Sequence, residues 1–253
     1  MTVTRCQAGD AREAASYDRA LGSEAAQLLL TDPPYCLLTR RRKEGDLRDP
    51  KGRKIEGEPV IRFETGRDYR TFTEGWLPKA IERLEPYAPA IIWTNFLGKE
   101  PILAVARACG YGHLQGEFAW AKLTGDRRAP QVLIANEQLA RIYEVALVLL
   151  REPLPPRPPD APAEVWTAAA GYDDEGEAEQ WGSHPNHKPF GVLEPLVRAW
   201  SRPGQLVLDP FAGSGSIPAA ALKLGRRAAC IELRPDWAQR VSVRLAGIGA
   251  PRS

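Results

Sequence analysis

Short apolar runs alternate along the chain with segments of amphipathic, helical character. Several of the runs are rich in Val, Ile and Leu, as strands buried on both faces of a parallel sheet are. This alternation predicts an α/β fold with a mostly parallel, twisted sheet flanked by helices. Strands are predicted over Gln27–Thr31, Ala90–Thr94, Glu117–Trp120, Val145–Leu150, Leu206–Leu208 and Ala228–Ile231. Helices are predicted over Trp76–Glu85, Glu100–Cys109, Gly191–Trp200, Ile217–Leu224 and Pro235–Leu245.

Two stretches depart from this alternation. Residues 38–72 are polar, basic and glycine-bearing, which predicts a long loop or small subdomain inserted into the fold. Residues 152–183 begin with a proline-rich run, typical of extended polyproline conformation, and continue acidic and loop-like. The length of 253 residues is compatible with one large α/β domain or with two small ones. We predict a single domain over residues 1–253 that carries both insertions.

The composition is that of an ordinary globular protein, with 43% hydrophobic and 26% charged residues. No apolar run approaches the roughly 18 residues that a membrane helix needs, and residues 1–10 carry no signal-peptide pattern. We therefore expect a cytoplasmic location and no membrane partner. The four cysteines form no CxxC pair and only three histidines are present, so neither a metal site nor a disulfide framework is indicated.

A first candidate motif, Asp32-Pro33-Pro34-Tyr35, directly follows a predicted strand. It therefore lies at the carboxyl edge of the sheet, where open α/β folds bind ligands. The amino group of a nucleobase is a poor nucleophile because its lone pair is delocalised into the ring. The Asp32 carboxylate and a backbone carbonyl held rigid by Pro33 and Pro34 could accept both amino hydrogens and favour a tetrahedral nitrogen.

In the same interpretation, Tyr35 stacks on an extruded base, because an aromatic face restores part of the stacking energy that the base loses. The alternative is a rigid turn that ends a strand, with Asp32 as the turn initiator.

A second motif, Asp209-Pro210-Phe211-Ala212-Gly213-Ser214-Gly215, joins a predicted strand to a predicted helix. Glycine in such a turn lets the backbone approach a ligand closely. The next predicted strand ends in Glu232, an acid suited to holding ribose hydroxyls. Neither GxGxxG nor GxxxxGK[ST] is present, which disfavours a dinucleotide or a nucleoside triphosphate. Plain βαβ structure without a ligand stays open as the alternative.

Taken together and in this order, the two motifs resemble the β class of amino-methylating DNA methyltransferases, the N6-adenine/N4-cytosine family. In that class the sequence is circularly permuted, so that the catalytic motif precedes the cofactor motif. The resemblance extends over nearly the whole chain. It implies a Rossmann-like methyltransferase fold, S-adenosyl-L-methionine as cofactor, DNA as partner and flipping of the target base. We expect the two motifs to meet at adjoining edges of one sheet.

The resemblance also implies roles for individual residues. Gly9-Asp10 resembles the family's early Gly-Asp, which implies that Asp10 lies near the adenine of the cofactor. The run from His184 to Pro189 matches His-Pro-x-x-Lys-Pro, which implies contact of Lys188 with the methionine end. The catalytic residues implied are Asp32, Pro33, Pro34 and Tyr35. The cofactor-binding residues implied are Asp10, Lys188, Asp209, Pro210, Phe211, Gly213, Ser214, Gly215 and Glu232.

Other parts of the family pattern are interpreted as structural. His184 and His187 are expected to be positional, Trp93 and Trp120 to be core aromatics, and Tyr143-Glu144 to belong to an element of mainly structural meaning. Ser216-Ile217 replaces the family's usual Thr-Thr, a change that keeps one hydroxyl.

The recognition segment is expected between residues 152 and 183, where the family usually carries it, but this stretch is short and acidic. An acidic stretch is a poor surface for phosphates. The DNA contacts are therefore expected from the basic segment after the first motif, or from a second subunit in a homodimer. For the basic segment, a solvated loop is the alternative. The residues expected to bind DNA are Arg40, Arg41, Arg42, Lys43, Arg48, Lys51, Arg53 and Lys54.

Adenine N6 is the expected target, because Asp-Pro-Pro-Tyr resembles the adenine-modifying members more than the cytosine-modifying ones, in which Ser often takes the first position. Cytosine N4 is the first alternative. Methylation of RNA or of a protein amide is the second, although enzymes of that kind generally carry the cofactor motif first. A DNA-binding protein without activity is the third. A cognate restriction endonuclease is a further candidate partner.

Overall fold

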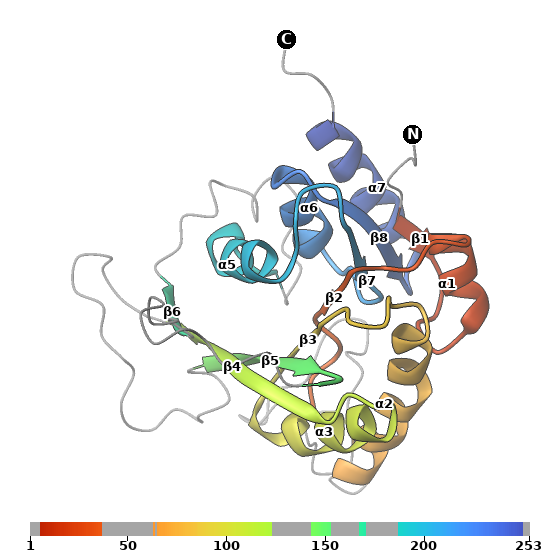
Figure 1. Cartoon of the computed structure of the whole chain (residues 1–253). Coiled ribbons are helices and arrows are strands. Elements are labelled where there is room, and N and C mark those ends of the chain that lie inside the picture. The colour runs from red at the N-terminus through yellow and green to blue at the C-terminus, as the bar shows by residue number, and fades with distance from the viewer. Residues whose placement is uncertain are drawn as a thin grey trace, which may run out of the picture.

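The described part of the chain forms a twisted sheet of eight strands with helices packed against it (Figure 1). The computed structural model describes residues 6–36, 63, 65–122, 143–152, 167–170 and 187–249. The strands are β1 (Cys6–Ala8), β2 (Leu28–Thr31), β3 (Ala90–Thr94), β4 (His113–Lys122), β5 (Tyr143–Leu150), β6 (Thr167–Ala170), β7 (Leu206–Asp209) and β8 (Arg227–Glu232). The helices are α1 (Ala14–Leu21), α2 (Gly66–Ile81), η1 (Phe96–Gly98), α3 (Lys99–Ala108), α5 (Phe190–Trp200), α6 (Ser216–Lys223) and α7 (Pro235–Gly249).

The strand order is β1-β8-β7-β2-β3-β5-β4-β6. All neighbouring strands are parallel except β5, which runs antiparallel to both β3 and β4. The predicted α/β fold with a mostly parallel sheet is therefore confirmed.

Helices cover both faces of the sheet. Leu29 of β2 packs in a core with side chains of α1, α2 and α3. Its neighbours Leu28 and Leu30 point the other way and pack in a second core with α5 and α6. Figure 1 shows the same division, with α1, α2 and α3 on one side of the sheet and α5, α6 and α7 on the other. Burial on both faces explains the continuous apolar runs of the central strands.

The strand order reverses between β2 and β7, which lie side by side and parallel. After β2 the chain continues through α2 to β3 on one side, whereas after β7 it continues through α6 to β8 on the other. A crevice opens at such a switch point, at the carboxyl ends of the two strands. The motif at Asp32 follows one of these ends and the glycine turn follows the other. Their expected juxtaposition is confirmed.

The predicted insertion over residues 38–72 is wrong at its end, because α2 begins at Gly66. The helix starts with a capping box in which Thr65 accepts from the Asp68 amide and Asp68 accepts from the Thr65 amide. Phe63, just before it, is buried and packs edge-on against Tyr69. The basic residues from Arg40 to Lys54 lie outside the described residues.

The stretch 152–183 is also not loop throughout, because β6 pairs in parallel with β4 at the edge of the sheet. This strand is Thr-Ala-Ala-Ala, so pairing with β4 and not intrinsic strand propensity accounts for it. Residues 153–166 and 171–183 lie outside the described part.

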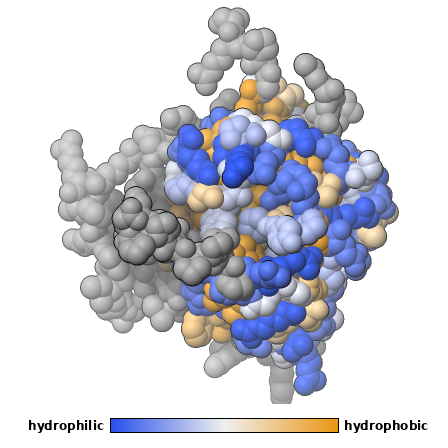
Figure 2. All heavy atoms as spheres, viewed as in Figure 1, coloured by the Kyte–Doolittle hydropathy of each residue, from blue (hydrophilic) through white to orange (hydrophobic). Residues whose placement is uncertain are grey.

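The face of the molecule seen in Figure 2 is mainly hydrophilic, with small hydrophobic areas between polar ones. None of the helices in the described ranges is long and apolar enough to cross a membrane. The same ranges contain no cluster of His, Cys, Asp or Glu that could hold a metal ion. The four cysteines are free thiols, and three of them are buried.

Thr65→Ala should lower the free energy of unfolding by about 1 kcal/mol, because it removes the side-chain acceptor of the α2 capping box. Thr71→Ala is the matched control, since Thr71 is an exposed residue of the same helix. Its effect should stay within about 0.5 kcal/mol. Urea denaturation of the two variants measures the difference, and equal effects would show that the cap does not stabilise α2.

Candidate active site

The turn between β7 and α6 requires glycine. Gly213 and Gly215 both have positive φ angles, 52° and 80°. A Cβ at Gly215 would lie 2.9 Å from a methyl carbon of Val241, too close for any other residue without a shift. The Gly213 amide donates to the Glu232 carboxylate at 2.9 Å, which ties the turn to the end of β8.

Asp209 links the ends of β7 and β2. Its Oδ1 accepts from the Thr31 hydroxyl at 2.8 Å and from the Phe211 amide at 3.1 Å. Its Oδ2 is buried and has no hydrogen-bond partner among the described residues. Burial raises the pKa of Asp209 to about 7, against the opposing effect of these two hydrogen bonds. The Asp209 Oδ2 therefore has an unused hydrogen-bonding position.

The loop after β2 is held from the neighbouring strand. Asn95, the residue after β3, donates from Nδ2 to the Cys36 carbonyl at 3.0 Å. The Asn95 Oδ1 in turn accepts from the Gly98 amide at 3.0 Å. The buried Asn95 side chain thus ties the loop after β2, at Cys36, to the end of β3.

The Lys188 ammonium lies between two acidic side chains. Its Nζ is 2.5 Å from Asp32 Oδ2 and 3.0 Å from Glu144 Oε2. Tyr35 completes the group, because its hydroxyl donates to Glu144 Oε2 at 2.8 Å and lies 3.2 Å from Lys188 Nζ. The three charged side chains are almost fully buried, with 3% of Lys188, 7% of Asp32 and 9% of Glu144 exposed.

Burial and charge oppose each other in this cluster. Burial disfavours the charged form of Lys188, but the carboxylates of Asp32 and Glu144 outweigh it and raise the Lys188 pKa. Burial raises the pKa of Asp32, and the negative charge of Glu144 adds to this effect, against the lowering effect of Lys188. Two carboxylates therefore share one ammonium, and the cluster carries a net negative charge when all three groups are ionised.

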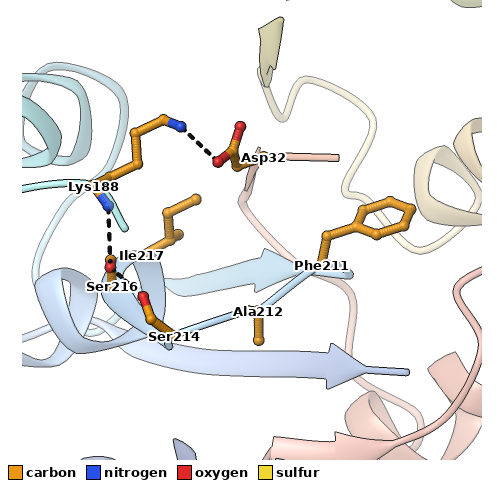
Figure 3. A pocket seen from close by; sticks show the side chains of 8 residues that line it. Asp32, Lys188, Phe211, Ala212, Ser214, Ser216 and Ile217 are labelled. Atoms are coloured by element: carbon orange, nitrogen blue, oxygen red, sulfur yellow. Dashed lines mark hydrogen bonds and ion pairs between the residues drawn. The ribbon is translucent and has the colours of Figure 1, made fainter. Parts of the chain in front are cut away.

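A pocket lies between Asp32 and the glycine turn (Figure 3). The pocket is partly open to solvent, and its space, including the open part, is about 290 Å³. Asp32 and Lys188 point toward each other on one side, and the glycine-turn residues lie on the other. Asp32 Oδ1 is buried and has no hydrogen-bond partner among the described residues. The pocket is lined by Asp32, Lys188, Phe211, Ala212, Gly213, Ser214, Ser216 and Ile217.

The structure brings together most of the residues expected in the site. Pro33 and Pro34 follow Asp32 on the β2 side, while Pro210 and Gly215 belong to the same turn as the pocket residues. Asp10 follows β1 and Glu232 is the last residue of the neighbouring strand β8, and both lie outside the pocket lining. The Asp10 carboxylate is paired with Arg12 at 2.6 Å.

The structure places Lys188 beside Asp32, so its expected contact with the methionine end of the cofactor stays a prediction. His187 lies within hydrogen-bond distance of the Ser214 and Ser216 hydroxyls, 3.2 and 3.0 Å from its Nδ1, as a positional residue does. His184 lies outside the described residues.

Sequence reasoning missed two residues of the site, Glu144 and Asn95. Glu144 was assigned a structural meaning, yet it contacts Lys188 and Tyr35. A carboxylate at the start of a buried strand was the available signal, since such a group requires a partner. The interpretation of Trp93 and Trp120 as core aromatics is confirmed, because both are buried and pack edge-to-face. Their rings also face the Lys188 ammonium at 5.1 and 5.9 Å.

Comparison with known proteins gives one consistent result. The sequence model of the N6_N4_Mtase family, described as "DNA methylase", matches residues 26–242. "Putative methylase YubD" of Escherichia coli (strain K12) is 29% identical over 231 residues, covering 88% of this chain and 83% of YubD.

Solved structures share the fold. The M1.HpyAVI-SAM complex superposes with a TM-score of 0.64 at 17% identity and covers 95% of this chain and 98% of that one. PvuII DNA methyltransferase (cytosine-N4-specific) gives 0.63 at 15% identity, with 94% and 84% covered. The putative DNA modification methylase TTHA0409 of Thermus thermophilus, complexed with S-adenosyl-L-methionine, gives 0.57 at 23% identity, with 99% and 100% covered.

Asp209 should make stability depend on pH. Its pKa is raised in the folded state, so the protein is most stable while Asp209 is protonated and loses stability as the pH rises through about 7. Asp209→Asn stays neutral. Between pH 5 and 8 the unliganded wild type should lose about 2 to 3 kcal/mol more than this variant, as expected for a shift of roughly three pKa units.

Denaturation at several pH values measures this difference. Asp236→Asn is the control, because Asp236 is exposed and Arg234 lowers its pKa, so that it does not titrate between pH 5 and 8. Parallel curves of stability against pH for wild type and Asp209→Asn would show that folding does not raise the pKa of Asp209.

Proposed function

We propose that this chain methylates adenine N6 in DNA. The chain belongs to the DNA methylase family whose model matches residues 26–242. The members of this family are S-adenosylmethionine-dependent enzymes that methylate base amino groups. One observation carries this proposal: Asp32 and the glycine turn, from adjacent parallel strands, line one pocket. Methyl transfer needs an amino group held by hydrogen bonds and a methyl donor bound next to it, in one pocket. Adenine is favoured by Asp in the first position of the tetrapeptide.

We assign the chain to the β class of this family. The assignment is supported by the order of the two motifs, since the tetrapeptide at residue 32 precedes the glycine turn at residue 213. The same order makes methylation of RNA or of a protein amide the less favoured activity. In this proposal the whole chain is one catalytic domain.

The residues of the pocket fit S-adenosylmethionine. Gly213 lines the pocket without a side chain and with a positive φ angle, and the buried Asp209 Oδ2, at the end of β7, has an unused hydrogen-bonding position. Asp209, Pro210, Phe211, Gly213, Ser214 and Gly215 would hold the cofactor, with Asp10 and Glu232 at the ends of the next strands and Lys188 opposite. When bound, the cofactor supplies an electrophilic methyl group on a sulfonium.

The tetrapeptide would hold the base. Asp32 Oδ1 accepts one hydrogen of the amino group, and the Pro33 carbonyl accepts the other, so that the nitrogen lone pair points into the pocket. Pro34 keeps the loop rigid. Tyr35 packs against the flipped base with its ring, while its hydroxyl is held by Glu144. Proximity and orientation of this kind account for several kcal/mol of barrier lowering, on the order of 7 kcal/mol or more in favourable cases.

Asp32→Ala should lower the single-turnover rate of methyl transfer by about 10³-fold, because the amino group loses its charged acceptor. Cofactor affinity should stay within about threefold, since the glycine turn is untouched. Asp18→Ala is the control, because Asp18 pairs with Arg83 at the surface. Full activity of the Asp32 variant would remove Asp32 from the mechanism.

The methylated base identifies the target. Wild-type protein is incubated with duplex DNA and labelled S-adenosylmethionine, and the DNA is then digested to nucleosides and analysed by mass spectrometry. N6-methyladenine is expected. Detection of N4-methylcytosine would show that the target is cytosine and not adenine. DNA binding without any methyl transfer would indicate a DNA-binding protein without activity.

The basic segment from Arg40 to Lys54 is proposed to contact DNA phosphates beside the flipped base. Replacing Arg40, Arg41, Arg42 and Lys43 by serine should weaken DNA binding and reduce the slope of log affinity against log salt concentration by about one for each phosphate that the variant no longer neutralises. Cofactor affinity is the internal control and should not change. An unaltered salt slope would assign the contacts elsewhere, for which the proposed homodimer is the first candidate. A partner endonuclease stays a prediction.

A further inference from the structure

Glu144 is a buried acid whose negative charge has no role in the reaction proposed above. It lies in β5 beside Lys188, and only 9% of its side chain is exposed. It is not among the residues that line the pocket. Removing a carboxylate from water opposes folding unless its new partners offset the lost hydration. The burial of the Glu144 carboxylate therefore indicates that its partners use its charge.

Two contacts of Glu144 meet on one oxygen. Oε2 receives the hydroxyl of Tyr35 at 2.8 Å and lies 3.0 Å from the ammonium of Lys188. Lys188 is at the same time bound to Asp32 Oδ2. Glu144 thus reaches both members of the tetrapeptide that carry polar side chains, Tyr35 directly and Asp32 through Lys188.

The charge balance determines what this arrangement does to Asp32. With Lys188 alone, one positive charge would be matched by one carboxylate, which would make Asp32 a weak acceptor. With Glu144 present, the same ammonium is shared between two carboxylates. Asp32 keeps more of its negative charge for its free oxygen, and the nearby like charge increases its affinity for a proton.

We propose that Glu144 is a positioning residue for methyl transfer, which divides the Lys188 charge and anchors the Tyr35 hydroxyl so that Asp32 can take up the proton released by the amino group. This inference rests on the proposed function of the site. The amino nitrogen gives its lone pair to the methyl carbon, and the electron pair of the broken carbon–sulfur bond stays on sulfur. The nitrogen, now positively charged, passes one proton to Asp32 Oδ1, and the Asp32 carboxylate becomes neutral.

The gain of that proton relieves a repulsion. Before transfer Asp32 and Glu144 are both negative and share one ammonium; afterwards Lys188 and Glu144 form a neutral pair. Among the described residues, the ionisable groups that face Asp32 are Lys188 from the segment before α5, Glu144 from β5, Tyr35 from its own loop, Tyr69 from α2 and Asp209 from β7. Burial and Glu144 raise the Asp32 pKa, whereas Lys188 and Tyr35 lower it. Asp209 is unchanged in each of the variants below, so its effect is common to all of them.

The test is the pH dependence of single-turnover methylation at saturating cofactor and DNA, with the full-length protein. The rate should rise with pH as Asp32 becomes ionised. Glu144→Gln keeps the shape and removes the charge, so the acid limb should move down by about one pH unit. The plateau rate should fall about tenfold or more, because Asp32 becomes a weaker proton acceptor.

Two further variants separate charge from packing. Glu144→Asp retains the charge, so its acid limb should stay within about 0.3 pH units of wild type although its rate falls. Tyr35→Phe removes a donor that stabilises the carboxylates, so its limb should move up, opposite to that of Glu144→Gln. Because Tyr35→Phe leaves Glu144 in place, it tests the same charge balance even if Glu144→Gln fails to fold.

Cofactor binding and thermal melting show whether each variant is folded. Opposite movements of the acid limb in Glu144→Gln and Tyr35→Phe support the proposal. A rate that falls equally at all pH values in both variants, with no movement of the limb, would reduce Glu144 to a structural residue and overturn it. Absence of methyl transfer by the wild type would instead overturn the proposed function, so that the two failures are distinguishable.

Discussion

The parallel pairing of β2 with β7 is the constraint on which the site depends. The two strands are far apart in the sequence, yet Leu29 pairs with Leu208 and the Thr31 hydroxyl is bonded to Asp209. Because the chain leaves them toward opposite sides of the sheet, a crevice opens at their carboxyl ends. The tetrapeptide and the glycine turn consequently meet at one pocket, although one lies near the start of the chain and the other near its end.

Around this pocket the protein maintains buried charge that is incompletely matched. Asp209 has a buried oxygen without a donor among the described residues, and Lys188 is shared between Asp32 and Glu144. Such groups reduce the stability of the folded chain, because carboxylates removed from water prefer to be neutral. A site that binds a cationic cofactor and an amino group benefits from carboxylates whose charge and hydrogen bonds are not fully matched, because the ligands supply the missing positive charge and the missing hydrogen-bond donor. The same features that cost stability therefore prepare the pocket for its proposed ligands.

Much of the fold could be predicted from hydrophobic patterning, and the failures have physical causes. The apolar run of β3 is buried on both faces, so its predicted and observed ends agree at Ala90 and Thr94. The first half of α2 was missed because Gly66 and Gly75 lower its helix propensity, and tertiary packing of Tyr69 and Trp76 compensates. The three residues of β1 are too few to show a period. The alanines of β6 become a strand only through β4.

For the site, residue types revealed the two motifs but not what surrounds them. Asp32, Phe211 and Gly213 could be placed at strand ends because their neighbours in the sequence predict those ends. Glu144 and Asn95 could not, since they act through contacts made by folding, with Lys188 and with the Cys36 carbonyl. Residue identity is local information, whereas sharing of a charge is a property of the packed structure.

The central claim is that a base amino group and a methyl donor meet between Asp32 and the glycine turn. It is tested most directly by a crystal structure of the protein with duplex DNA and an unreactive analogue of S-adenosylmethionine. The account predicts a flipped adenine whose amino nitrogen lies within hydrogen-bond distance of Asp32 Oδ1, with the analogue against Gly213 and Gly215. A target base or an analogue bound outside this pocket would contradict it.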